Sequence, residues 1–210
     1  MEDNVNLIYE KVLGRLLALT DGVFAFAITL LIVNVALPSG TLQANLPAAL
    51  GDLWPKYKAF VISFIVIGLY WTVHVRQFRV ITKYNTNLMW LNLLFLFFIV
   101  IIPFSTSVLS DYHGELPAII YAANMACAGF AATGTWLYAT QNHRLVVENL
   151  SRVFIKRGII VRLVTPIIFS LSIGVAFFDP TVTQFLWVGI FVIHFILSRI
   201  YRVSEKGENV

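Results

Sequence analysis

The chain has 210 residues, of which 59% are hydrophobic and only 12% are charged, and its mean hydropathy is +0.80. Soluble domains are roughly half apolar and about a quarter charged, so this composition excludes a soluble enzyme with an aqueous surface, and equally a disordered, collagen-like or disulfide-rich chain. The single cysteine, Cys127, excludes an internal disulfide and any zinc site built from several cysteines.

Long apolar segments follow one another along the chain, and each has about 20 residues or slightly more. An α-helix of that length crosses about 30 Å of hydrocarbon and satisfies its own backbone polar groups in lipid. The segments are 16–37, 57–78, 88–109, 116–138, 158–178 and 182–201. The first is too long for a signal peptide and no small-residue cleavage site follows it, so we expect it to be retained. Residues 1–210 are thus predicted to form one all-α, six-helix transmembrane domain.

The basic residues predict the orientation of these helices, because Lys and Arg collect on the cytoplasmic flanks of membrane spans. If the N-terminus is inside, every Lys and Arg of the chain lies on the inner side except Lys56 and Lys58. Both termini are therefore expected to be cytoplasmic. The net charge of +4 then reflects topology and some attraction to membrane lipid, and it does not indicate binding to nucleic acid.

Ionisable side chains inside the segments are the first candidates for function, since each costs about 2.5–3.5 kcal/mol at the centre of a membrane helix. Asp21 lies about 9 Å deeper than Arg15 at 1.5 Å per residue. Trp71, His74 and Arg162 fall near the same depth on the second and fifth segments. We expect these groups to form a buried, hydrogen-bonded network. It acts either as a proton relay or support for an ion path, or as a clamp between helices without transport chemistry.

Other polar residues inside the segments have a simpler interpretation. His194, midway along the last segment, is expected to be a neutral histidine bonded to a neighbour. Asn92, Asn124 and Gln184 are expected to form hydrogen bonds between helices.

One face of the first segment is apolar over its whole depth. At about 100° per residue, a stripe of residues lies within about 40° of Phe26. The stripe comprises Arg15, Leu19, Gly22, Phe26, Leu30, Val33 and Leu37. Asp21 points about 140° away from Phe26. Taken alone, the stripe is what any membrane helix shows on a lipid-facing or packed side.

Three motifs resemble the transmembrane protein 175 family, the lysosomal and prokaryotic potassium channels that lack a conventional filter. The family's mark on its first helix is Arg, three residues, then Phe-Ser-Asp, and here Arg15 precedes Leu19-Thr20-Asp21. The pair Trp71 and His74 looks like the family's Trp-x-x-His segment on the second helix. Leu91-Asn92, followed by Ile102-Pro103-Phe104, is similar to the third helix.

The resemblance implies a homotetramer around a central path for monovalent cations, lined by four copies of the first helix, in a prokaryotic plasma membrane. Phe26, Leu30 and Val33 correspond to the family's apolar pore ring, which can gate by dewetting. The cluster that corresponds to the family's interhelical network comprises Arg15, Thr20, Asp21, Trp71 and His74. No cofactor is expected, only permeant K⁺.

Two features bear on selectivity. The family usually has Ile or Leu at the position of Phe26, so a ring of four phenylalanines is bulkier and is expected to close the pore more tightly. Thr29, one turn from the constriction and about 60° off the stripe, is a candidate to offer its hydroxyl to a permeating ion if the helix rotates. Selectivity for potassium over sodium is then expected to be modest and to come from size and dehydration.

The channel interpretation has alternatives. The chain lacks Thr-Val-Gly-Tyr-Gly, which excludes a carbonyl-lined potassium filter, and has no helix with Arg at every third position. A proton-coupled secondary transporter would use Asp21 and His74 as its titrating pair. An intramembrane enzyme is disfavoured, because the spans hold no zinc-ligand pair at helical spacing, no Gly-x-Ser-x-Gly and no paired carboxylates. The sequence therefore predicts a potassium-permeable cation channel.

Overall fold

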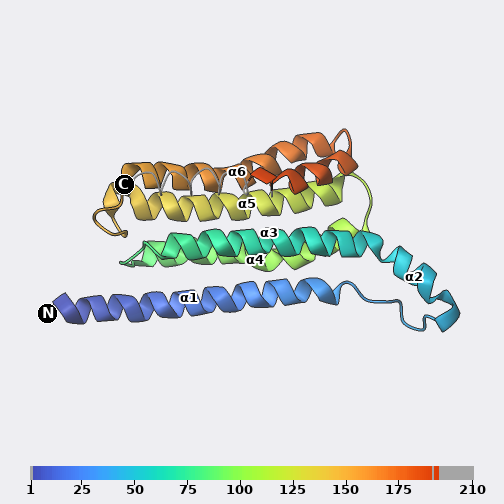
Figure 1. Cartoon of the computed structure of the whole chain (residues 1–210), viewed down its shortest axis with the longest axis horizontal. Helices are drawn as coiled ribbons and strands as arrows, with labels where there is room; N and C mark the ends of the chain where they lie inside the picture. The colour runs from blue at the N-terminus through green and yellow to red at the C-terminus, as the bar shows by residue number, and fades with distance from the viewer. Residues whose placement is uncertain (1, 191, 194–210) are drawn as a thin grey trace, which may run out of the picture.

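The computed structural model of the chain describes residues 2–190, 192 and 193, and they form a bundle of long helices (Figure 1). In chain order the helices are α1 (Glu2–Val33), α2 (Leu46–Asp52), α3 (Trp54–Phe78), α4 (Thr86–Asp111), α5 (Glu115–Thr140) and α6 (Arg152–Ala176). Two 3₁₀ turns, Gln43–Asn45 and Gln141–His143, precede α2 and follow α5. Residues 180–190 and 192–193 are also helical.

Five of the described helices are long and apolar enough to cross a membrane, namely α1, α3, α4, α5 and α6. The chain is thus an all-helical, multi-pass membrane protein. The last predicted segment, 182–201, is helical as far as it is described, but its remainder, with His194 and the C-terminus, lies outside the described residues. The count of six and the side of the membrane on which the termini lie therefore stay predictions.

Helix α1 differs from its predicted segment at both ends. It begins at Glu2, well before the predicted segment, and Leu13 and Leu16 are buried against the rest of the bundle. It ends at Val33 rather than at residue 37. The Val35 amide donates to the Ile32 carbonyl at 2.9 Å, which closes a turn, and Pro38 restricts the residue before it to extended backbone.

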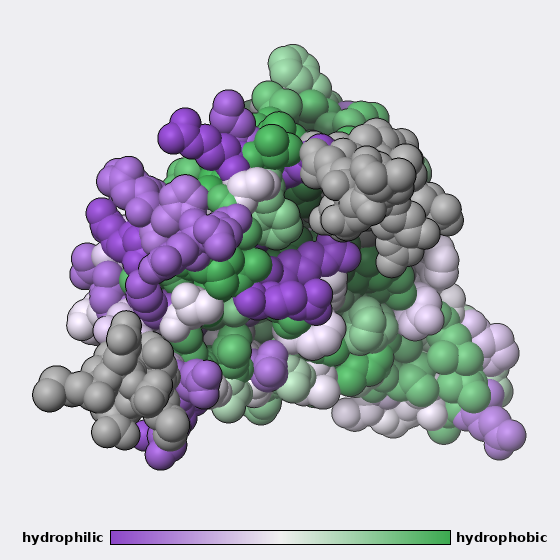
Figure 2. Space-filling model, turned by 60° about the vertical axis from the view of Figure 1, so that its left-hand side comes forward, coloured by the Kyte–Doolittle hydropathy of each residue, from purple (hydrophilic) through white to green (hydrophobic). Residues whose placement is uncertain are grey.

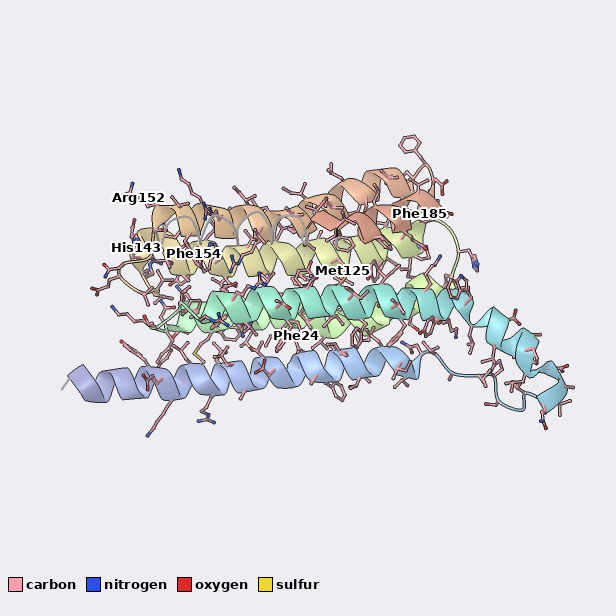
Figure 3. All side chains as sticks on the ribbon, viewed as in Figure 1. Phe24, Met125, His143, Arg152, Phe154 and Phe185 are labelled. Atoms are coloured by element: carbon pink, nitrogen blue, oxygen red, sulfur yellow. The ribbon has the colours of Figure 1, made fainter. Side chains whose placement is uncertain are left out.

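The helices lie in three layers, with α1 below, α3 and α4 in the middle, and α5 and α6 above in the view of Figure 1. Helix α1 packs on α3 and α4 by one face, and a long connection containing α2 joins its far end to α3. The core between the layers includes Phe24, Ile67, Ile99 and Met125, all buried. Phe24 extends from α1 toward the middle layer (Figure 3).

Helices α5 and α6 approach each other closely because small residues stand where they cross. A Cβ atom built on Gly129 would lie 2.7 Å from Cδ of Pro166. One built on Gly158 would lie 2.9 Å from the ring of Trp136. Small side chains at such positions let backbones meet and gain van der Waals contact, which is the main attraction between helices in lipid.

The end of the bundle that carries the N-terminus is closed by the α3–α4 and α5–α6 connections. Ile81 and Val146 form an isolated antiparallel β-bridge. The Thr82 amide donates to the Leu145 carbonyl at 2.9 Å, and the Val147 amide to the Val80 carbonyl at 3.1 Å. Hydrophilic side chains gather over this end (Figure 2). Lys56 and Lys58 stand instead at the start of α3, at the opposite end, as the predicted charge asymmetry requires.

Candidate pore helix and its interhelical hydrogen bonds

Helix α1 has one buried face and one face that the rest of the described chain leaves uncovered. Phe24, Ala27 and Leu31 are only 2%, 2% and 1% exposed. On the other side, Phe26 is 63% exposed and Val33 is 66% exposed. An exposed apolar face on a helix that is already packed on its opposite side is available to line a path, to meet another copy of the chain or to face lipid.

The predicted stripe occupies this uncovered face, with one member at its margin. Arg15, Leu19 and Gly22 are exposed in line with Phe26 and Val33. Leu30 is half-buried, because its angle on the helix turns it toward the packed side. Leu37 is exposed but lies beyond the end of α1.

Thr29 lies near the centre of the uncovered face. Its hydroxyl lies within donor distance of two backbone carbonyls of its own helix, at 3.0 Å from Ala25 and 2.9 Å from Phe26. The single O–H is therefore used inside the helix, while the oxygen lone pairs remain on the exposed side. A backbone-bonded hydroxyl of this kind can act as an acceptor for a cation.

A chain of hydrogen bonds links α3, α4 and α1 on the buried side. Asn92 of α4 donates from Nδ2 to Thr20 Oγ1 at 3.0 Å, and Thr20 donates to the Leu16 carbonyl at 2.9 Å. The Oδ1 atom of Asn92 is therefore left to accept from Nε2 of His74, at 2.8 Å. This direction assigns the proton of a neutral His74 to Nε2. Asn92, Thr20 and His74 are all buried.

Aromatic rings enclose His74. Its imidazole stacks on Phe78 with ring centroids 4.3 Å apart and lies nearly parallel to Phe95 at 5.7 Å. Phe24 of α1 approaches it at 6.2 Å. The Nδ1 atom of His74 is buried without a hydrogen-bond partner among the described residues. This ring is therefore held firmly between helices by packing on its faces and by one strong bond at its edge.

A second, separate link joins α1 to α3. Trp71 donates from Nε1 to Asp21 Oδ1 at 3.0 Å, in an exposed position. Asp21 does not bond His74, whose partner is Asn92. Within the described residues Arg15 makes no hydrogen bond or ion pair, so the structure does not bring it into the predicted cluster. The cluster is thus two links, Thr20–Asn92–His74 and Asp21–Trp71, and Arg15 stands apart on the uncovered face.

Arg162, which the sequence analysis places at the depth of Asp21 and His74, has other partners. Its guanidinium sits over the ring of Trp136 at 4.0 Å, and Nη1 donates to the Gly158 carbonyl at 2.9 Å. Nε donates to Gln77 Oε1 at 3.4 Å. Arg162 therefore joins α6 to α5 and α3, and not to Asp21.

Sequence reasoning missed Gln77 and a further polar group at the other end of the bundle. Ser63 Oγ lies 2.8 Å from Thr106 Oγ1 and 3.0 Å from Tyr121 Oη, so that α3, α4 and α5 meet at one buried point. The signal for Gln77 was its place three residues after His74, which puts both on one side of α3. Hydroxyl residues give no such signal, because they also bond their own helix backbone.

Comparisons with known proteins agree with this architecture. Residues 15–103 match the family described as "Endosomal/lysosomal potassium channel TMEM175". A protein of Streptomyces collinus named as a potassium channel is 33% identical over 175 residues, which cover 81% of this chain and 85% of that protein. The fold matches the crystal structure of a lysosomal potassium-selective channel TMEM175 homologue from Chamaesiphon minutus with a TM-score of 0.74 at 23% identity, over 90% of this chain and 97% of that one.

A vertebrate relative carries a different name. The chicken endosomal/lysosomal proton channel TMEM175 is 36% identical over 117 residues, which cover 50% of this chain and 23% of that protein. The fold and the relatives together define a membrane ion channel rather than an enzyme. The chain belongs to the TMEM175 family of potassium channels.

Proposed function

We propose that this protein is a potassium-permeable cation channel, a homotetramer in which the uncovered face of α1 from each subunit lines a central path. The observation that carries the proposal is the two-sidedness of α1: Phe26 and Val33 are exposed on a helix whose opposite face is buried in its own subunit. The names of the bacterial relatives support potassium as the permeant ion.

In this proposal Phe26, Leu30 and Val33 form a hydrophobic constriction that closes by excluding water. Phe26 is the bulkiest of the three, and its 63% exposure leaves it free to meet its copies at the axis. Leu30 stands at the edge of the face, so a small rotation of α1 would bring it further in. Thr29 lies on the same face and would offer lone pairs to an ion passing the constriction.

The two links behind α1 set its orientation. Thr20 is tied to α4 through Asn92, and Asp21 is tied to α3 through Trp71. Both links lie away from Phe26 on the helix, so they fix which face α1 turns outward without entering the path. These residues are therefore positioning residues of the channel.

We place the protein in the plasma membrane, with the N-terminal end of the bundle in the cytoplasm. The support is the charge distribution: exposed basic residues occupy the helix ends and connections of that end, including Arg76, Lys83, Arg144 and Arg152. Positive charge on cytoplasmic flanks is the general rule for membrane proteins.

The geometry favours the channel over the proton-coupled transporter built on Asp21 and His74. These two side chains have separate partners and do not bond each other. A shared proton site needs direct contact or one bridging group between them. The name of the chicken relative makes proton flux worth measuring in the same assay.

Purified protein in liposomes under opposed potassium and sodium gradients tests the proposal through its reversal potential. Phe26→Ala should increase cation flux, because it removes the bulk of the constriction. Phe104→Ala is the matched control: Phe104 is 65% exposed on α4 and outside the proposed path. Equal flux in both variants would show that another surface conducts. A reversal potential that follows only a pH gradient would favour proton transport.

A further inference from the structure

A groove lies between α3 and the helical residues 180–190, at the end of the bundle away from the N-terminus. It holds a cavity of about 280 Å³. Its walls are mostly apolar and aromatic: Trp54, Tyr57 and Val61 on one side, Phe185 and Val188 on the other. Figure 3 labels Phe185 at this end of the molecule. The volume is near the lower end of the range of about 300–1,000 Å³ typical of small-molecule sites.

A second cavity, of about 300 Å³, adjoins the first. The two share the residues Lys58, Ile62, Thr181 and Gln184. The walls of the second cavity also include Ser110 and His113, from the end of α4 and the turn into α5, so it is more polar than the first, although apolar residues still form most of its surface. The groove as a whole is therefore amphipathic, with its polar and apolar parts meeting at Lys58 and Gln184.

Two polar groups at this junction lack protein partners. Within the described residues Lys58 forms no ion pair, whereas Lys56, two residues earlier, pairs with Asp111 at 3.1 Å. The Oε1 atom of Gln184 is buried and accepts no hydrogen bond from any described group. The junction thus presents a positive charge and a buried acceptor, which are satisfied together by an anion that also carries a hydroxyl.

Two aromatic residues indicate that the apolar part of the groove starts near the membrane surface. Trp54 and Tyr57 stand in the first turn of α3, their ring centroids 6.4 Å apart. Trp and Tyr prefer the interface between headgroups and hydrocarbon. From there the groove runs along α3 past Val61, toward the hydrocarbon, as an acyl chain does.

We propose that this groove binds one anionic phospholipid with a hydroxylated headgroup, of the phosphatidylglycerol type. The phosphate pairs with Lys58, a headgroup hydroxyl donates to Gln184, and one acyl chain lies between Trp54 and Phe185. A helix from a second copy of the chain fits the groove less well. It would cover the apolar walls but leave the charge of Lys58 and the acceptor of Gln184 unpaired inside an interface.

Native mass spectrometry of the full-length protein tests this, after reconstitution into vesicles of equal parts phosphatidylglycerol and phosphatidylcholine and extraction into mild detergent. We expect phosphatidylglycerol to be retained preferentially. Lys58→Gln should lower its retention about fivefold, the factor for losing one lysine–anion contact. Lys56→Gln, which removes the same charge two residues away, should leave it unchanged.

Further experiments distinguish a bound lipid from the other possible occupants of the groove. Val188→Trp fills the apolar part and should remove the bound lipid of either kind, while size-exclusion profiles show that the variant is folded. Equal retention by the Lys58 and Lys56 variants would overturn the headgroup assignment. Displacement of the lipid by millimolar glycerol 3-phosphate would identify a soluble phosphate ester as the ligand. A disulfide between subunits carrying Trp54→Cys and Phe185→Cys would show that a second copy fills the groove.

Discussion

Replacing Asn92 with leucine, which has the same branched shape but no polar atom, removes the centre of the link between α3, α4 and α1. Two bonds are lost, one at 3.0 Å to Thr20 and one at 2.8 Å from His74. Hydrogen bonds between membrane helices contribute about 0.6 kcal/mol on average and up to about 1.7. The Nε2–H of His74 is also left buried without an acceptor, which costs about 1–3 kcal/mol. We therefore expect Asn92→Leu to lower the free energy of unfolding by about 2–4 kcal/mol.

The assay is reversible unfolding of the purified protein in mixed micelles of rising SDS fraction, followed by far-UV circular dichroism. Asn124→Leu is the matched control, since Asn124 is also buried but its bonds to the Phe98 carbonyl and Ser105 are longer, at 3.3 and 3.4 Å. It should lose less than about 1.5 kcal/mol.

A double-mutant cycle identifies the cause. His74→Phe retains the aromatic packing with Phe78 and Phe95 but removes the N–H donor. In combination with Asn92→Leu it leaves no unpaired N–H, so the loss in the double variant should be smaller than the sum of the single losses by about 1–2 kcal/mol. Strict additivity, or equal losses at Asn92 and Asn124, would refute the assigned hydrogen-bond chain.

Three further predictions concern packing, the second link and pH. Gly129→Ala should destabilise the protein by about 1–3 kcal/mol in the same unfolding assay, because the new Cβ atom would overlap Pro166. Gly134→Ala is the control: a Cβ atom there meets no atom within 4 Å, so this variant should stabilise the helix slightly. Trp71→Phe removes the bond to Asp21 and should lower the melting temperature without moving the potassium–sodium reversal potential; a shifted potential would place this pair in the ion path. Backbone amides of Thr181 and Val182 hold the pKa of Asp179 below its usual value of 3.8. The ionised carboxylate of Asp179 therefore stabilises the fold at neutral pH, and this stabilisation is lost as the pH falls below that value. Asp179→Asn should make the melting temperature depend less on pH in the acid range.

Sequence reasoning reached the class of fold and the orientation of α1 because both follow from local rules. Span length indicates a membrane helix, and helical periodicity places Phe26 and Val33 on one face with Asp21 turned away. The position of Leu30 at the edge of the uncovered face follows from its angle on the helix, once the packed side of α1 is known. The early start of α1 was missed because residues 2–14 are too polar to count as a span, although they continue the helix and Leu13 is buried.

The partners of the polar residues were harder to predict. The position of a residue along a span gives its depth, and depth was the only basis for grouping Asp21, His74 and Arg162. Which side chains meet at one depth depends on the lateral arrangement of helices distant in sequence. Arg162 therefore pairs with Trp136 and Gln77, and Asn92 separates His74 from Thr20. The groove at Lys58 lies between segments more than a hundred residues apart and has no local signature at all.

Helix α1 is attached to its subunit by one face and has a long connection at its far end, so it can tilt about the point where it is attached. Thr20, bound to Asn92, is fixed near its middle, and Val33 stands 13 residues further on, about 20 Å away at 1.5 Å per residue. A swing of about 5° about that point carries Val33 through about 1.7 Å while Leu19 hardly moves. A slight tilt of the helix about Thr20 would therefore move Val33, at the C-terminal end of the uncovered face, much further than the residues beside Thr20.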